Sequence, residues 1–126
     1  MSISVRINRK DRLVLTRFSS RVTDDDVRQQ IDLIAAGAPY DGTYCAITDF
    51  THVERFDVTT EMIRTVASQP SPLASAKRVI VAPGDVQYGI SRMFQALSQN
   101  TRPDITVVRD MAEACAILKI SPEALV

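Results

Sequence analysis

The stretch RVIVAPGDVQYGISRMFQAL, from Arg78 to Leu97, has the pattern of one buried strand followed by one helix. Arg78–Ala82 is a short run rich in β-branched residues, and Pro83-Gly84 interrupts it. Asp85 is then in position to cap a helix, and we expect Gly89 to lie where that helix closely approaches a strand. The residues expected to form a core-facing stripe recur at helical spacing: Val86, Ile90, Met93, Phe94 and Leu97.

Strands and amphipathic helices alternate on both sides of this stretch. We predict strands at Ile3–Ile7, Leu13–Phe18, Tyr44–Phe50 and Ile105–Arg109, and helices at Thr23–Gly37, Thr59–Ser68 and Asp110–Leu118. Thr23 with Asp26, and Asp110 with Glu113, have the spacing of helix caps, and a polar loop is expected after Phe50. The order β-β-α-β-α-β-α-β-α predicts an α/β fold in one domain, residues 1–126. Its sheet is expected to be mostly parallel with right-handed crossovers and an antiparallel N-terminal edge strand.

Composition excludes several classes of protein. The chain has 126 residues, and its 15 Lys plus Arg balance 15 Asp plus Glu, so no general attraction to nucleic acid is expected. No apolar run is long enough for membrane insertion, and MSISVRINRK lacks the apolar region of a signal peptide. Cys45 and Cys115 lie in apolar segments without C-x-x-C spacing, which favours buried, reduced thiols in a cytoplasmic protein.

The segment GDVQYGIS, Gly84 to Ser91, has the glycine spacing of a phosphate-binding P-loop. A P-loop needs a lysine before its final Ser or Thr, and Ile90 stands there instead. Asp85 also stands where the anion would lie, so nucleotide hydrolysis is not expected. A weaker anion site remains open as an alternative, because any helix N-terminus offers free amides.

No other catalytic or metal-binding set emerges. His52 is the only histidine and is expected to be a solvated loop residue. No G-x-S-x-G elbow marks a nucleophilic serine. Asp24, Asp25 and Asp26 resemble a metal cluster, but acids in a first helical turn favour the helix dipole. We therefore predict no enzyme activity, no catalytic residue, no metal and no cofactor.

The segment TDFTHVERFDVTTEMI, Thr48 to Ile63, resembles the signature of STAS domains, the fold of bacterial anti-sigma-factor antagonists such as SpoIIAA. The matching positions are Asp49-Phe50-Thr51, Val53, Phe56-Asp57 and Thr59. The C-terminal half, from RVIVAPGDVQYGISRMFQAL through VVRDMAEACAIL, resembles small bacterial SpoIIAA-like proteins without assigned function. The resemblance implies a STAS fold and a regulatory, protein-binding role.

The departures from that signature concern its phosphorylation switch. In the phosphorylatable antagonists, the modified serine directly follows the motif aspartate, and here Val58 follows Asp57. Thr60 replaces the motif glycine. The standard serine switch is therefore not expected, although Thr59 or Thr60 could substitute as a phosphorylation site instead of serving only to cap the following helix.

Ligands of open parallel sheets bind beyond the carboxyl ends of the strands. The candidate binding or regulatory residues at that rim are Asp49, Asp57, Thr59, Thr60, Gly84, Asp85, Tyr88 and Arg92. Two functions follow as hypotheses. One is a non-enzymatic regulatory module that binds a protein partner or forms a homodimer through the edge strand or a helix face. The alternative is a domain that binds a small-molecule or lipid-like ligand at the strand ends.

Overall fold

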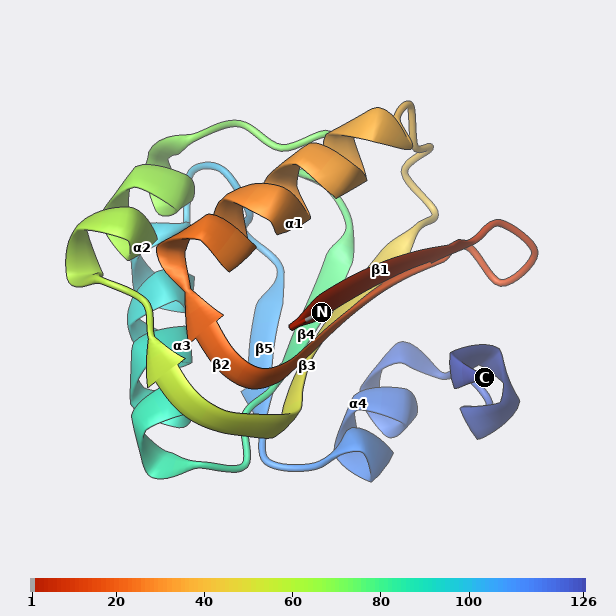
Figure 1. The fold of residues 1–126 in the computed structure, drawn as a ribbon. Helices are drawn as coiled ribbons and strands as arrows, with labels where there is room; N and C mark the ends of the chain where they lie inside the picture. Colours follow the sequence, from red (N-terminus) through yellow and green to blue (C-terminus); the bar gives the residue numbers. More distant parts are fainter. Residues whose placement is uncertain (1) are drawn as a thin grey trace.

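Five strands form one sheet in the computed structural model, which describes residues 2–126 (Figure 1). They are β1 (Ile3–Asn8), β2 (Leu13–Thr23), β3 (Cys45–Asp57), β4 (Lys77–Val81) and β5 (Ile105–Val108), and they lie side by side in that order. β1 pairs antiparallel with β2, and the other three pairs are parallel. This confirms the predicted α/β fold with an antiparallel edge strand; Met1 of the expected domain lies outside the described residues.

The helices are divided unequally between the two faces of the sheet. Three helices, α1 (Asp24–Ala36), α2 (Thr60–Ser68) and α3 (Asp85–Leu97), cover one face, while α4 (Met111–Leu118) and the short turn η1 (Pro122–Leu125) cover the other (Figure 1). Neighbouring strands in sequential order, joined by right-handed crossovers, place every crossover helix on the same side. The strand order therefore never reverses within the described sheet.

Alternate side chains of each strand supply two cores, one on each face of the sheet, and the core under α1, α2 and α3 comprises two clusters. Phe18, Phe50 and Ile80 point toward α2 and α3, where buried residues such as Ile63 and Val66 meet them. Their strand neighbours point to the opposite face and pack against α4 and η1; these are Leu13, Leu15, Ile47, Val79 and Val81. The period of two is the one that strands impose. Cys115 is buried in the second core, Cys45 is only half-buried, and both thiols are free.

β2 and β3 extend further than predicted and curl together away from the sheet (Figure 1). The predicted polar loop after Phe50 is wrong, because β3 continues to Asp57 and pairs with β2 as far as Thr23. His52 accordingly lies exposed on a strand and not in a loop. The extended parts of β2 and β3 together form a curled ribbon. Register shifts near Ser20, whose φ is 61°, bend this ribbon, as β-bulges do. Polar side chains fit here because one side of the ribbon faces solvent.

α3 is rotated relative to the predicted stripe. Its outer residues Val86 and Leu97 are 64% and 45% exposed, whereas Gln87 and Ser91 are buried. A Cβ on Gly89 would meet nothing within 4 Å, so the predicted close approach at this glycine is wrong. Gly84, not Asp85, is the N-cap residue, and Asp85 is the first helical residue. Ile90, Met93 and Phe94 are half-buried against the first core, so the apolar stripe faces partly toward α2 and not squarely toward the sheet.

Candidate functional site

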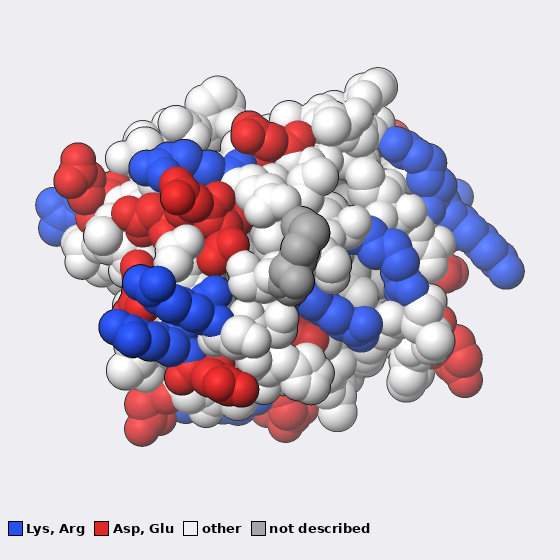
Figure 2. Space-filling model, viewed as in Figure 1, with Lys and Arg blue, Asp and Glu red and all other residues white. Residues whose placement is uncertain are grey.

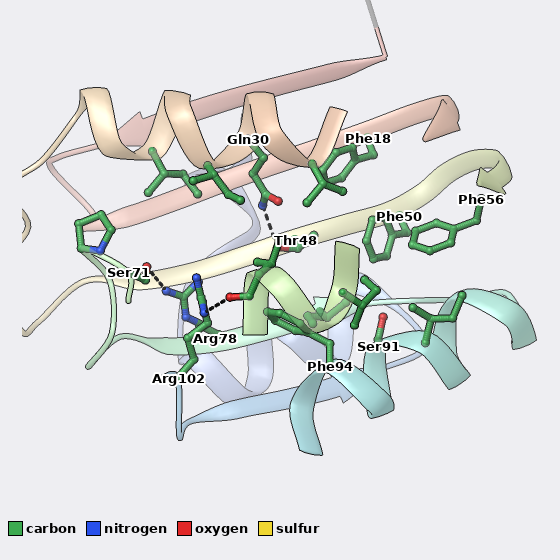
Figure 3. A pocket seen from close by; sticks show the side chains of 18 of the residues that line it. Phe18, Gln30, Thr48, Phe50, Phe56, Ser71, Arg78, Ser91, Phe94 and Arg102 are labelled. Atoms are coloured by element: carbon green, nitrogen blue, oxygen red, sulfur yellow. Dashed lines mark hydrogen bonds between the residues drawn. The ribbon is translucent and has the colours of Figure 1, made fainter. Parts of the chain in front are cut away.

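An apolar pocket of about 120 Å³ lies between the sheet and its three crossover helices (Figure 3). β2, β3 and β4 form its floor, α1 and α3 form opposite walls, and α2 contributes Ile63 and Val66. The aliphatic and aromatic lining residues are Phe18, Val27, Ile31, Ile34, Phe50, Phe56, Ile63, Val66, Ile80, Ile90 and Phe94. The pocket exists because α3 turns Ser91, a small residue, toward the sheet and its larger residues to the side.

The middle of the pocket floor carries Thr48, whose hydroxyl group is already hydrogen-bonded. Thr16 of β2 and Thr48 of β3 are opposite one another in the parallel register. Gln30 of α1 reaches both: its Nε2 donates to Thr16 Oγ1 over 3.1 Å. The same Nε2 donates to Thr48 Oγ1 over 3.5 Å (Figure 3). These bonds tie α1 to the sheet and satisfy polar atoms that would otherwise be costly to bury.

One end of the pocket is aromatic. The Phe18 and Phe50 rings lie 5.3 Å apart between centroids, and Phe56 meets Phe50 edge-on at the same separation. Phe56 reaches this place only because β3 curls over past Phe50, so the extended ribbon closes this end. A tilted and edge-to-face cluster of this kind stabilises the wall beyond the area it buries.

The other end of the pocket is cationic, because Arg78 and Arg102 converge there (Figure 3). Arg78 is the second residue of β4 and points to the helical face. Its Nη2 donates to Ser71 Oγ and to the Leu73 carbonyl oxygen, both over 2.9 Å, whereas its buried Nε has no partner in residues 2–126. Burial, assisted by the nearby Arg102 charge, lowers the pKa of Arg78 to about 10.

Arg102 is only 6% exposed, although it lies in the connection between α3 and β5. Its Nη1 donates to the carbonyl oxygens of Val66, over 2.9 Å, and Gln69, over 3.0 Å, at the end of α2. Its guanidinium also lies 5.7 Å from the centroid of the Phe94 ring. Burial lowers the pKa of Arg102. Within residues 2–126, neither Arg102 nor Arg78 forms an ion pair with a carboxylate.

The residues predicted at the strand-end rim fall into separate groups, and none of them lines this pocket. Asp49 is buried, accepts a 2.9 Å hydrogen bond from the Thr51 amide and lies 3.6 Å from Arg17 Nε. Asp57 contacts two arginines, Arg21 Nε at 2.7 Å and Arg55 Nε at 2.8 Å. The Arg21 hydrogen bond, joined by Arg55, lowers the pKa of Asp57.

Thr59 and Thr60 differ in the hydrogen bonds that their hydroxyl groups form. Thr59 is the N-cap of α2: its Oγ1 accepts from the Met62 amide over 3.1 Å and donates to Asp24 over 2.8 Å. Thr60 is exposed on the first turn of α2. Val58, at the place of the motif serine, is buried in the first core.

A third rim group surrounds the start of α3. Arg109 Nη1 donates to Asp85 Oδ1 over 2.9 Å and to the Pro83 carbonyl oxygen over 3.2 Å, and its guanidinium lies 3.9 Å from the centroid of the Tyr88 ring. Asp85 and Tyr88 are therefore brought together, while Arg92 is exposed further along the helix. These contacts occupy the polar groups nearest the Gly84 cap.

The rim lacks the feature that makes strand ends a binding crevice in other open sheets. Such crevices form where the strand order reverses and adjacent connections leave on opposite faces. In this sheet the order is sequential and every crossover helix lies on one side. The volume available to a ligand lies instead over the sheet face, beneath α1 and α3.

Sequence reasoning missed both arginines and the Gln30–Thr48 pair. Arg78 carried a readable signal, because a charged residue opens an otherwise apolar, β-branched strand. Arg102 carried none: it stands in a polar connection next to Pro103, where a solvated arginine is the ordinary expectation. Only the packing of α2 against α3 shows that this connection turns inward.

Residues 2–126 present neither a cluster of metal ligands nor a helix that could span a membrane. That part of the chain contains no group of three or more His, Cys, Asp or Glu side chains arranged to hold a metal ion. Its helices are all too short or too polar to cross a bilayer.

Among solved structures, the chain is similar to the crystal structure of an uncharacterized protein from the DUF3478 family with a SpoIIAA-like fold, from Shewanella loihica PV-4. The match has a TM-score of 0.58 and 15% sequence identity, and it covers 92% of this chain and 91% of the other. No family model matches this chain, and no curated protein matches it. Identity this low supports the fold alone. The sheet order, the placement of the helices and this match together assign the chain a SpoIIAA-like fold.

Proposed function

We propose that this protein is a non-enzymatic binding module and that a small, mainly apolar ligand occupies the pocket between α1 and α3. The observation that carries the proposal is the pocket itself: apolar walls with a few polar groups converging at one end. Small-molecule sites have this composition, because apolar walls provide affinity and a few polar groups fix orientation.

The pocket lining supports binding more than catalysis. Its hydroxyl groups are those of Thr48, Ser71 and Ser91. The lining residues include no histidine, cysteine, aspartate or glutamate, so no base is present there to activate a hydroxyl. His52 is exposed on the curled ribbon and is not part of this lining.

The volume limits the size of the ligand. An engineered, dry cavity of about 150 Å³ binds one benzene molecule. A pocket of about 120 Å³ therefore suits a single ring or a short alkyl chain. A full-length membrane lipid would fit only if α1 and α3 moved apart.

A second candidate is a protein-interaction module, and the outer face of α3 favours it. Val86 and Leu97 are exposed there, with the half-buried Met93 between them along the helix. Exposed apolar residues aligned on one helix are typical of a face that meets another protein. In this candidate the partner is a protein or a second copy of the chain. In this candidate the standard serine switch is not expected, because Val58 carries no hydroxyl group, and the hydroxyl groups that could substitute are those of the exposed Thr59 and Thr60.

Neither candidate involves nucleic acid. The chain has a formal net charge of zero, and Figure 2 shows acidic and basic side chains interleaved on the face it draws. Binding to a phosphate backbone depends on a concentrated positive surface.

Native mass spectrometry of gently purified protein, with the denatured mass measured beside it, tests both candidates. For the ligand-binding module, we expect an adduct that is lost on denaturation or, if the pocket is vacated during purification, an upward shift of the melting temperature with small apolar probes. A dimer without adduct that no such probe stabilises would contradict the ligand-binding proposal and favour the interaction module.

A further inference from the structure

We propose that the pocket selects a short-chain carboxylate, whose carboxylate group binds between Arg78 and Arg102 and whose tail extends toward Phe50 and Phe56. This inference rests on the proposed function and adds the chemical class of the ligand. It also places the charged group away from the strand-end rim, at the opposite end of the sheet face.

The first argument is charge. Arg78 and Arg102 bring two positive charges into one partly closed, largely apolar space, and their mutual repulsion helps to lower the pKa of Arg78. Buried charges in proteins are normally paired, because an uncompensated charge in an apolar setting is strongly destabilising. Every ion pair in residues 2–126 involves other arginines. A bound anion would supply the missing compensation.

The second argument is the supply of hydrogen-bond donors. A guanidinium carries five N–H donors in a planar fork. Arg78 uses only its Nη2 and Arg102 only its Nη1 for the chain. Nε and Nη1 of Arg78 and Nε and Nη2 of Arg102 have no partner in the described residues. A carboxylate has acceptor-only oxygens and pairs with such forks in a bidentate manner.

The bonds that Arg78 and Arg102 do make hold them in place for this role. Arg78 is anchored to Ser71 and Leu73, and Arg102 to the carbonyl oxygens that end α2. Both anchors are neutral oxygen atoms, so they orient the guanidinium groups without neutralising them. If Arg78 and Arg102 served only to hold the neighbouring connections in place, bringing both charges into the same apolar space would add no stability.

The remaining lining residues determine what kind of tail the ligand carries. From the cationic end, the pocket runs past Phe94 to the aromatic cluster (Figure 3), and Ile34 and Ile80 also line it. The polar Gln30 and Thr48 between these ends are bonded to one another. They therefore require no polar group from the middle of the ligand. Hexanoate, with a short alkyl chain and one carboxylate, is a suitable probe for a pocket of this size.

The experiment compares hexanoate, 1-hexanol and hexyl phosphate on the full chain, using amide NMR titrations that tolerate weak binding. We expect hexanoate to bind at least tenfold more tightly than 1-hexanol, with shifts at residues lining the pocket. With [1-¹³C]hexanoate, the bound carboxylate should protonate at a lower pH than the free acid, because the two arginines stabilise its charged form.

Substitutions test whether the carboxylate group of the ligand binds at Arg78. Arg78→Met should weaken the binding of hexanoate at least tenfold and leave the binding of 1-hexanol nearly unchanged. The matched control Arg92→Gln, on the exposed side of α3, should change the affinity for neither compound. If Arg78→Met does not fold, the hexanoate to 1-hexanol ratio on the unaltered protein and the ¹³C titration decide alone.

The outcomes separate this inference from the function on which it rests. Equal binding of hexanoate and 1-hexanol would overturn the carboxylate assignment and leave the ligand-binding module standing. Tighter binding of hexyl phosphate than of hexanoate would also overturn it, in favour of a phosphate group. If none of the three compounds shifts a resonance of the pocket lining, both the inference and the proposed function fail.

Discussion

Asp57 lies between two guanidinium groups where β3 ends. Arg21 Nε donates to its Oδ2 over 2.7 Å from β2, and Arg55 Nε contacts the same oxygen over 2.8 Å from within β3. The Arg21 hydrogen bond is the largest influence, and together with Arg55 it outweighs the opposing effect of burial, so the pKa of Asp57 is lowered. This carboxylate ties the tips of β2 and β3 together through charge, beside the apolar packing of Val22 and Phe56.

We expect Asp57→Asn to lower the free energy of unfolding near neutral pH and to make stability less dependent on pH in acid. A carboxylate whose folded pKa is depressed contributes stability above its unfolded pKa, about 3.9 for aspartate. That contribution is lost as the pH falls through the folded value. Urea unfolding measured from pH 7 to pH 2 should therefore show the two proteins converging below about pH 4.

The matched control for this prediction is the same substitution in an Arg21→Gln background. There the difference in stability between the protein that keeps Asp57 and its Asp57→Asn variant should shrink, because the main cause of the pKa shift has been removed. A difference that is unchanged by Arg21→Gln, or that grows in acid, would contradict the assignment.

At the scale of elements, α3 is a helix whose apolar stripe does not coincide with its buried face. Gln87 and Ser91 face the sheet, and Gln87 Nε2 reaches the Val53 carbonyl oxygen of the curled ribbon over 3.5 Å. This rotation leaves space beside Ser91 for the pocket and exposes Val86 and Leu97 on the outside. Both candidate sites therefore follow from the way one helix is turned.

Gly89, in the middle of α3, gives a direct test of that rotation. Since a Cβ there meets nothing within 4 Å, we expect Gly89→Ala to stabilise the protein by about 0.5–1 kcal/mol through helix propensity alone. Thermal and urea unfolding would measure the change. Gly37→Ala is the contrasting substitution, because its Cβ would collide with Ile7 and Tyr40 and should destabilise. Destabilisation by Gly89→Ala would mean that this face of α3 is packed after all.

At the scale of the whole molecule, the sheet separates two cores that share strands but few side chains. One core, under α1, α2 and α3, contains the pocket; the other is closed by α4 and by the last turn, η1. Arg6 and Arg17 donate to the carbonyl oxygens of Ala124 and Leu125, which fastens that turn to β1 and β2. The C-terminal residues are therefore part of the fold and distant from the ligand site.

Leu125→Ala should test this independence. Leu125 is buried in the second core, so we expect a loss of about 2 kcal/mol in the free energy of unfolding, at the lower end of the range for buried leucines. Val126→Ala, at a residue that is 90% exposed, should have no measurable effect. Binding of hexanoate should be the same in both variants, because the pocket lies on the opposite face; a weakened affinity in folded Leu125→Ala would show that the two cores are coupled.

Local patterns in the sequence determined the α/β fold, the order of elements, most of their bounds and the antiparallel edge, because periodicity and capping act within a few residues of one another. Arg78–Leu97 was informative for that reason, and Thr48–Ile63 was informative through its resemblance to the STAS signature. The β2–β3 extension was beyond such reasoning, since polar residues join a strand only when a partner completes their backbone hydrogen bonds.

The rotation of α3 and the meeting of Arg78 with Arg102 depend on tertiary packing and not on any local pattern. The two arginines are brought together by the docking of α2, α3 and the connections that follow them. Their burial depends on where these separate segments pack, and no periodicity within any one segment encodes it. The sequence therefore specified the framework, while packing between distant segments created the pocket and determined which charged groups face it.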